Sequence, residues 1–314
     1  MMQKWTKPLP RPIRVSVLIF DQFSNLCLAN CLEPMRAANT VTRSAAFDWS
    51  ILTPDGAPVT SSSGMQVLPH AALGDMAPCD YLFVHASYGH EALNTAPMRR
   101  AIARAARQAD VVVGLDAGPW LLAAAGMLEG RRATLHWDLI EPFGEAFLQV
   151  DVQRARVVRD GPVMTCAGAM SALDLMLGLI GDHLGAAGRL DVEDHVMHGS
   201  RTRAPDPQGR APMIRRALAL MRAHVEQPLS LGALAEALSV QPRTLDRRFR
   251  AALGAPPGTV YRHLRLSEAL KLLESTRLSV SEIAVRCGYE SPAALARAMR
   301  RRYGRAPSNL RSAF

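Results

Sequence analysis

The sequence predicts a protein of two domains, in which an α/β domain with a mostly parallel sheet precedes an all-helical domain. The chain has 314 residues, and a single hydrophobic core rarely extends beyond about 250 residues. Roughly the first 185 residues alternate between strand and helix patterns, as in domains with helices on both faces of a parallel sheet. The last third contains only helical patterns. We therefore expect two domains of different class.

Five short apolar runs are the predicted strands of the sheet: Arg14–Phe20, Trp49–Thr53, Tyr81–His85, Val111–Leu115 and Ala133–Leu135. β-Branched residues such as Val15, Val17 and Ile19 follow each other closely, which is typical of strands buried on both faces. Helices are predicted in the gaps, at Leu26–Val41, Met98–Gln108, Pro119–Ala125 and Met170–His183.

Proline-rich segments mark the expected domain boundaries. Residues 1–13 carry charge and three prolines but no apolar run, so we expect a disordered tail and not a signal peptide. The segment from Gly199 to Pro212 contains three prolines and two glycines. We expect a linker there, over residues 199–211, between an α/β domain at 14–198 and a helical domain at 212–314.

The apolar stretches and the cysteines point to a cytoplasmic protein. The most apolar stretch, Val111 to Leu128, is interrupted by Asp116, Gly118 and Pro119, so no membrane span is predicted. The five cysteines form no CxxC pair, and we expect them to be reduced, structural thiols. No metal site and no cofactor are predicted.

The positive charge is concentrated in the helical domain. Residues 1–210 contain 19 Lys and Arg against 21 Asp and Glu, whereas residues 211–314 contain 18 against 7, a net charge of +11. Seventeen of those 18 cations are arginine, whose planar guanidinium can bind a phosphate or a guanine edge through two hydrogen bonds. Double-stranded DNA is the expected partner. A basic surface that serves only solubility is the alternative.

An internal repeat in the helical domain predicts two helix-turn-helix units, at residues 230–250 and 279–302. The segment from Leu229 to Ser239 aligns with the segment from Leu278 to Gly288 at an offset of 49. Each unit has a serine at the start of a short helix, a tight turn and a second helix rich in arginine. A helix over Pro257–Leu273 is expected to hold the two units at a fixed spacing.

The second helix of such a unit lies in the major groove of DNA. Its apolar positions face the core, so the remaining positions are the candidate DNA contacts. In the first unit these are Arg243, Thr244, Asp246, Arg247 and Arg250. In the second unit they are Arg297, Arg300 and Arg301. The alternative is that the arginines only cover a solvated helix face.

This region resembles the AraC family over about 100 residues. The family pattern of a Gly-aromatic-x-Ser segment, a helix and a closing Gly-x-x-Pro is matched by Gly288, Tyr289, Ser291, Gly304 and Pro307. Leu295 and Met299 depart from it, because the family commonly has phenylalanine there. The resemblance implies a sequence-specific transcription regulator, in most cases an activator, that contacts RNA polymerase, and we expect a homodimer.

The first domain resembles the ThiJ/PfpI branch of the class I glutamine amidotransferase superfamily, as fused to AraC domains in GlxA-type regulators. The matching segments are the strand-turn-helix around Asp116, the run from Leu128 to Trp137, and Thr165–Gly168. The resemblance implies a flavodoxin-like α/β sandwich. Enzymatic relatives carry a cysteine at the sharp turn, a histidine after the next strand and an acidic residue near the N-terminus. Asp116, His136 and Glu33 stand at those places here.

Asp116 supplies no thiolate, so covalent cysteine chemistry is not expected and no catalytic residue is assigned. A carboxylate at the turn, with Glu33 nearby, favours a cation, for which four aromatic residues offer π faces: Trp120, Trp137, Tyr88 and Phe23. The chain resembles in particular the cysteine-lacking subgroup of these regulators that responds to arginine, carnitine, glycine betaine and related amines. The predicted effector is such an amine or amino-acid-like molecule.

Three alternatives remain open for the first domain. In the first, Trp120 and Trp137 are core packing and Asp116 only caps the next helix. In the second, the domain serves dimerisation alone. The third is an amidase-, deglycase- or hydratase-type enzyme with a DNA-binding tail, for which a cysteine at position 116 would be the distinguishing feature.

Overall fold

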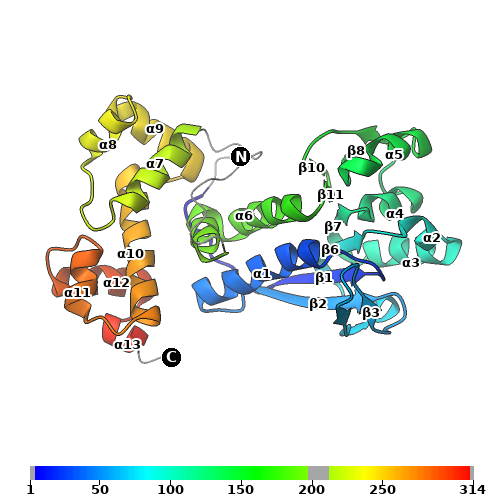
Figure 1. Cartoon of the computed structure of the whole chain (residues 1–314), viewed down its shortest axis with the longest axis horizontal. Helices are drawn as coiled ribbons and strands as arrows, with labels where there is room; N and C mark the ends of the chain where they lie inside the picture. The colour runs from blue at the N-terminus through cyan, green and yellow to red at the C-terminus, as the bar shows by residue number, and fades with distance from the viewer. Residues whose placement is uncertain (1–3, 197–211, 312–314) are drawn as a thin grey trace. The chain divides into compact units, whose positions relative to one another are not determined.

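The structure is a computed structural model of the whole chain, and it describes residues 4–196 and 212–311 (Figure 1). These residues form two compact units. One comprises residues 8–183 and 188–196, and the other comprises residues 4–7, 184–187 and 212–311. The expected linker at 199–211 lies outside the described residues, as do residues 1–3 of the expected tail.

A mostly parallel sheet of seven strands forms the centre of the α/β unit (Figure 1). Its strand order is β10-β11-β7-β6-β1-β2-β5, and only β10 and β11 pair in antiparallel fashion among these described strands. The strands are β1 (Ile13–Ile19), β2 (Phe47–Thr53), β5 (Ala71–Ala72), β6 (Cys79–Ala86), β7 (Ala109–Asp116), β10 (Val157–Asp160) and β11 (Val163–Cys166). The predicted fold class is confirmed.

One predicted strand lies outside this sheet. The run Ala133–Leu135 contributes only its first residue to β8 (Arg132–Ala133), which pairs with β9 (Asp151–Val152) in a separate two-stranded sheet. A second small sheet joins β3 (Val59–Thr60) to β4 (Gln66–Val67). The edge strand β10 was not predicted, because it is short and contains two charged residues.

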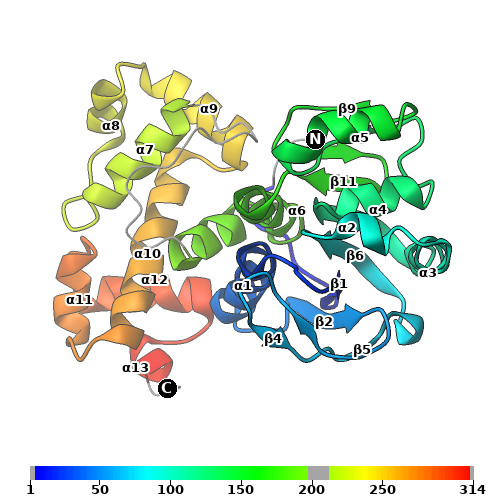
Figure 2. The same ribbon diagram turned by 45° about the vertical axis from the view of Figure 1, so that its right-hand side comes forward.

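Helices cover both faces of the main sheet (Figure 2). On one face lie α1 (Asn25–Thr42) and α6 (Ala169–Val196); on the other lie α3 (Ala96–Ala106), α4 (Gly118–Ala124) and α5 (Ile140–Ala146), with the short α2 (His90–Leu93) beside α4. The alternation along β6 shows both faces: Tyr81 bonds His183 of α6 at 2.7 Å, whereas Leu82 belongs to the apolar cluster that contains Ile102 of α3. Burial on both sides explains the nearly continuous apolar runs.

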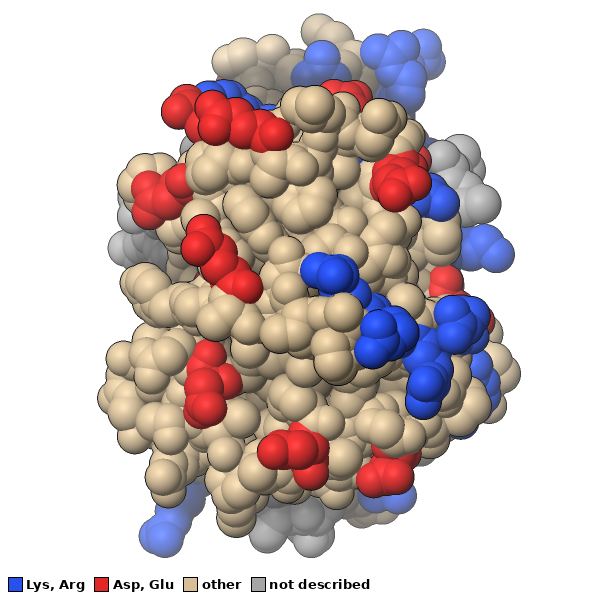
Figure 3. All heavy atoms as spheres, turned by 90° about the vertical axis from the view of Figure 1, so that its right-hand side faces the viewer, with Lys and Arg blue, Asp and Glu red and all other residues tan. Residues whose placement is uncertain are grey.

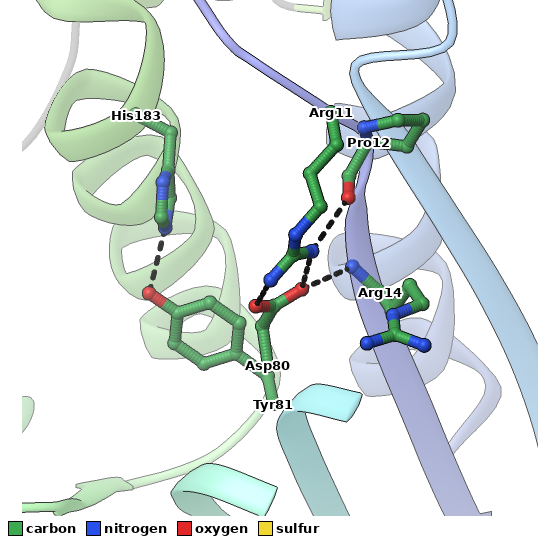
Figure 4. A network of polar contacts seen from close by, with 6 residues as sticks. All are labelled: Arg11, Pro12, Arg14, Asp80, Tyr81 and His183. Atoms are coloured by element: carbon green, nitrogen blue, oxygen red, sulfur yellow. Dashed lines mark hydrogen bonds and ion pairs between the residues drawn. The ribbon is translucent and has the colours of Figure 1, made fainter. Parts of the chain in front are cut away.

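The segment that precedes β1 is bound to β6, unlike the disordered tail that the sequence predicts (Figure 4). The Arg11 guanidinium donates to both carboxylate oxygens of Asp80, at 2.8 and 2.6 Å, and the Arg14 backbone N–H donates to the same carboxylate at 2.7 Å. The hydrogen bond from Arg11 is the main cause that lowers the pKa of Asp80. Such two-point, charge-assisted pairs are among the stronger side-chain contacts, and this one fixes the chain where β1 begins.

Helix α6 changes direction at Gly185, where φ is +84°. The backbone N–H groups of Ala186 and Ala187 donate to the carbonyl oxygens of Lys4 and Trp5, at 3.0 and 2.9 Å. A Cβ atom on residue 185 would lie 2.7 Å from the Trp5 oxygen. Glycine is therefore required both by the backbone angle and by the close passage of residues 4–7.

The C-terminal unit contains the predicted repeat. Its helices are α7 (Pro212–Ala223), α8 (Leu231–Ala237), α9 (Pro242–Leu253), α10 (Pro257–Ser275), α11 (Val280–Arg286), α12 (Pro292–Tyr303) and α13 (Pro307–Arg311). Pairs α8–α9 and α11–α12 are the two helix-turn-helix units, and α10 joins them (Figure 1). Ser230 and Ser279 cap the first helix of each unit, and Glu282 completes a capping box with Ser279. No helix within residues 4–196 and 212–311 is long and apolar enough to cross a membrane.

Candidate DNA-binding surface and effector site

Helix α9 is strongly two-sided. Leu245, Phe249 and Leu253 are buried, as the helical spacing predicts. Of the five predicted DNA contacts on this helix, Arg243, Arg247 and Arg250 are exposed and Thr244 and Asp246 are half-buried. The Arg250 Nε atom donates to the Asp246 carboxylate at 2.7 Å. Arg243 and Arg247 thus lie on the exposed face of the first half of α9. In such units, residues in this part of the second helix make the base contacts.

Helix α12 also buries an apolar face, but its exposed basic residues lie at different positions along the helix. Leu295 and Met299 are fully buried, and Arg297, Arg300 and Arg301 are exposed. Its first turn carries Pro292, Ala293 and Ala294, which have no hydrogen-bonding side chains. The cations of α12 therefore lie in its middle and last turns, whereas those of α9 begin at its first turn.

The connecting helix α10 sets the spacing of the two units. It has 19 residues, which at 1.5 Å per residue gives a length of about 28 Å. Successive turns of the major groove on one face of DNA are about 34 Å apart. The two second helices are thus separated by a rigid element of the correct order of length for adjacent major grooves.

The α/β unit does not share the strongly basic character of the helical unit. Figure 3 shows the face of the α/β unit that lies on the right in Figure 1, with acidic side chains dispersed over it and a smaller group of basic side chains. Residues 1–210 carry a net charge of −2. The cationic surface expected of a DNA-binding protein belongs to the helical unit.

Asp116 occupies a sharp turn between β7 and α4. Its φ is +60°, a backbone conformation that few residues other than glycine, asparagine and aspartate adopt. The residue is only 6% exposed. Burial is the largest effect on the carboxyl group and raises its pKa, while His136, Ser87 and His90 act in the opposite direction. The turn thus holds a carboxyl group whose ionised form is poorly solvated.

Two histidines and one serine influence the ionisation of this carboxyl group. The His136 backbone N–H donates to the Asp116 carbonyl oxygen at 3.0 Å, and the His136 side chain lies close enough to lower the Asp116 pKa. Ser87 and His90 follow β6, whose last residue, Ala86, pairs with Asp116. Ser87 and His90 both act to lower the pKa of the carboxyl group, against the effect of burial. Ser87 lies just beyond the carboxyl end of β6, His90 begins α2, and His136 follows β8. Ligands commonly bind at the carboxyl ends of the strands in open α/β sheets.

The four predicted aromatic residues do not form one cage. Trp137 and Tyr88 are 72% and 69% exposed, and the Trp137 ring lies 5.6 Å from that of His136. Phe23 is fully buried and contacts His85. Trp120 is 9% exposed and packs against His90, Phe143 and Phe147. Only Trp137 and Tyr88 are exposed next to residues that neighbour Asp116.

Glu33 does not accompany Asp116 as a buried second carboxylate. Its side chain is 53% exposed and bonds Arg36 at 2.7 Å. The buried face of α1 near the sheet is formed instead by Cys27 and Cys31. Glu33 is six positions after Cys27, about 240° around the helix, which places it on the solvent side.

His90 and Ser87 are the site residues that sequence reasoning missed. Their position in the sequence could have identified them, because both follow the carboxyl end of the predicted strand Tyr81–His85. Functional residues are common at this end of the strands in this fold class. Tyr88, between them, was selected for its ring, yet its side chain is the exposed one.

Comparison with known proteins identifies both units. Residues 13–181 match the DJ-1/PfpI family, and residues 234–313 match a helix-turn-helix domain. The chain is 34% identical over 305 residues to the HTH-type transcriptional regulator CdhR of Pseudomonas aeruginosa, covering 94% of this chain and 90% of that protein. It is 33% identical over 310 residues to the HTH-type transcriptional regulator GlxA of Rhizobium meliloti, covering 95% of each.

A solved structure gives the same fold. The crystal structure of a ThiJ/PfpI family protein from Pseudomonas syringae superposes with a TM-score of 0.54 at 21% identity, covering 76% of this chain and 93% of that one. Together with the two helix-turn-helix units and the full-length relatives, this shows that the chain belongs to the AraC-type, DNA-binding transcriptional regulators that carry a DJ-1/PfpI domain.

Proposed function

We propose that this regulator responds to a small cationic metabolite, such as arginine, carnitine or glycine betaine, held at Asp116, and that it acts as a dimeric activator that contacts RNA polymerase. The observation that carries the proposal is the buried carboxyl group at the turn between β7 and α4. From the resemblance to enzymes of the superfamily, we expect Asp116 to stand where they have a cysteine. The remainder of the proposal rests on resemblance to AraC-type activators.

The surroundings of Asp116 favour a cationic ligand. Burial disfavours the ionised carboxylate, and the groups that oppose this effect are His136, Ser87 and His90, with no described lysine or arginine among them. A ligand cation would supply the missing positive charge, and the contact would gain from the low local dielectric. An anion would meet the carboxylate in the same confined space.

Thiol catalysis has little support in this chain. The five cysteines are free and buried. Burial is the leading cause that raises the pKa of Cys166, next to the turn, and of Cys287, and a thiol with a raised pKa forms little of the reactive thiolate. The proposed role of the α/β unit is therefore ligand binding without chemistry.

The effector site is tested by calorimetric titration of the full-length protein with arginine, carnitine and glycine betaine. We expect one of them to bind the wild type and to bind Asp116→Asn at least about tenfold more weakly, because a charge-assisted contact is lost. Glu33→Gln is the matched control, since it removes a carboxylate that is exposed and paired with Arg36. Equal affinity of wild type and Asp116→Asn would place the ligand elsewhere, and no binding by any cation would favour an α/β unit that only dimerises.

The DNA-binding role is assigned to the helical unit. Affinity for a promoter fragment should fall steeply with salt, because each neutralised phosphate contributes about −0.9 to the slope of log K against log salt concentration. Residues 212–314 expressed alone should retain this dependence, since they hold both units and the positive charge. A salt-independent affinity would contradict the assignment.

A further inference from the structure

We infer that Gln241, at the start of α9, recognises an adenine in the major groove, and that the first helix-turn-helix unit supplies most of the base-sequence specificity. The inference concerns DNA recognition and does not depend on the effector site. It starts from a chemical difference between the first turns of α9 and α12, which are otherwise built alike.

Helices α9 and α12 correspond residue by residue. Each has 12 residues, begins with a proline and ends before a glycine with a φ of +71°. Their buried apolar residues lie at the same positions, Leu245 and Phe249 in one and Leu295 and Met299 in the other. The exposed positions of α9 therefore have defined counterparts on α12, and the two helices can be compared position by position.

The residues that precede the two helices differ in what their side chains do. The Ser291 hydroxyl accepts a hydrogen bond from the Ala294 backbone N–H at 3.2 Å and so caps α12. Its counterpart, Gln241, is exposed, and its side chain does not cap α9. Serine is among the residues that favour this position, and glutamine is not. The Gln241 amide thus adds nothing to the cap of its helix, which leaves it for another role.

The start of α9 carries side chains suited to base recognition. The early residues of the second helix are those that contact base edges in such units. Gln241 lies there two positions before Arg243, with Arg247 one turn further along, and all three are exposed. A glutamine amide has both donors and an acceptor, so it can bond N6 and N7 of adenine together, whereas arginine bonds O6 and N7 of guanine. The first unit can therefore recognise both purines.

The corresponding part of α12 lacks these groups. Ala293 and Ala294 stand where α9 has Arg243 and Thr244. Within α12, Arg297 is the first residue whose side chain can hydrogen-bond to a base, and the other basic residues lie in the last turn. Contacts to phosphates add affinity but carry no direct sequence information. We therefore expect the second unit to contribute mainly affinity.

The test uses the full-length protein and the duplex of highest affinity that it selects from a random pool. Each adenine of this duplex is replaced in turn by 7-deazaadenine, which lacks the N7 acceptor. Dissociation constants are measured by fluorescence anisotropy at one salt concentration. We expect one replacement to weaken binding about fivefold or more, because a two-point contact to that base is disrupted.

The role of Gln241 is tested with Gln241→Ser, which gives α9 the capping residue of α12 and removes the amide. We expect this variant to melt at the same temperature as wild type or higher, yet to bind the selected duplex about 5- to 100-fold more weakly. Its affinity for random DNA should be kept. The sensitive adenine should no longer respond to 7-deaza replacement, because its N7 atom has lost its partner.

Gln227→Ala is the matched control, since Gln227 is an exposed glutamine between α7 and α8, outside both helix-turn-helix units. We expect it to leave the affinity for both DNAs unchanged. Gln241→Ala gives the same measurement if the serine variant does not fold.

Base-pair substitutions along the selected duplex test the division between the units. We expect the strongest preferences in the segment whose bases respond to Gln241→Ser and Arg247→Ala. Stronger preferences outside that segment would overturn the assignment of specificity to the first unit.

The remaining outcomes separate Gln241 from DNA binding as such. If Gln241→Ser weakens selected and random DNA equally, or changes neither, the inference is wrong while DNA binding by the helical unit stands. A response to 7-deazaadenine that persists in the variant would assign that base to another residue and also overturn the inference. If the full-length protein selects no sequence at all, both the inference and the proposed DNA-binding role fail.

Discussion

The guanidinium group of Arg265, on α10, lies 4.4 Å from the ring centroid of Tyr289, in the turn of the second helix-turn-helix unit. The same side chain donates from Nε to the Cys287 carbonyl oxygen at 2.7 Å and from a terminal nitrogen to that of Gly288. One side chain thus satisfies two carbonyl groups at the end of α11 and stacks on the next residue. It ties the turn to the helix that sets the spacing of the two units.

Arg265→Lys should weaken this connection, because an ammonium group lacks the planar fork that serves two carbonyl groups and a ring at once. We expect a loss of about 1–2 kcal/mol in the free energy of unfolding, measured by urea denaturation, together with weaker DNA binding. Arg262→Lys, an exposed substitution on the same helix, is the control. Equal stability of the two variants would show that the Arg265 contacts contribute nothing.

The turns of the two units should differ in what they tolerate. Ser239 and Gly288 both have positive φ, +54° and +68°, but a Cβ on residue 288 would lie 2.6 Å from the Pro228 ring and 2.8 Å from the Val225 carbonyl oxygen. Gly288→Ala should therefore destabilise by about 2 kcal/mol or more. Ser239→Gly should be neutral or stabilising by up to about 1 kcal/mol, since glycine relieves the backbone strain. Thermal unfolding of both variants checks this, and a harmless Gly288→Ala would disprove the predicted clash.

Arginines at the two ends of the basic surface should affect DNA binding differently. Arg247→Ala, in the middle of α9, should cost about 1–3 kcal/mol on the cognate site and relax specificity at one base position. Arg301→Ala, in the last turn of α12, should weaken cognate and random DNA alike, as expected of a phosphate contact. Anisotropy titrations with both DNAs distinguish the roles. An equal loss on both DNAs for Arg247→Ala would make that residue a phosphate contact.

Asp116→Asn should stabilise the ligand-free protein at neutral pH. Because burial raises the pKa of Asp116 in the folded state, the stability that this group contributes is present below its ordinary pKa and is lost as the pH rises through the raised value. Asparagine also accepts the positive φ. Melting temperatures of wild type and variant, measured from pH 4 to pH 8, should diverge as the pH increases. A gap that stays constant with pH would mean that ionisation of Asp116 is not the cause.

The affinity for a cationic ligand should instead increase with pH. A cation needs the ionised carboxylate. We therefore expect arginine affinity to fall as the pH is lowered through the raised pKa of Asp116, and to depend much less on pH in Asp116→Asn. Calorimetric titrations at several pH values test this. An affinity that is unchanged or stronger at low pH would argue against the carboxylate as the binding group.

The features that the sequence predicted well are those fixed by neighbours along the chain. Caps such as Ser230 and Ser279, and the apolar spacing of Leu245 and Phe249, act within one or two helical turns, so both helix-turn-helix units could be placed from the sequence alone. Asp116 could be placed at a turn because the strand before it and the proline after it are adjacent in sequence. These are local signals.

The features that were missed depend on contacts between distant segments. The binding of Arg11 to Asp80 orders a segment that looks disordered by composition. The His90 ring is positioned by the Ser87 carbonyl oxygen and by Trp120. Trp120 itself packs against other rings and so does not contribute to an aromatic cage. Glu33 is exposed and paired with Arg36, and the helical period of α1 places it away from Cys27 and Cys31.

The kink of α6 at Gly185 has a consequence for the order in which the protein opens. The amides of Ala186 and Ala187 are bonded to carbonyl groups of Lys4 and Trp5, which lie almost a whole α/β domain earlier in the chain. Residues 4–7 are exposed or half-buried, and terminal segments of this kind open at low free energy. In hydrogen–deuterium exchange these two amides should therefore lose protection well before those of the central strand β6. When residues 4–7 detach, the two parts of α6 lose the hydrogen bonds that hold the backbone at Gly185.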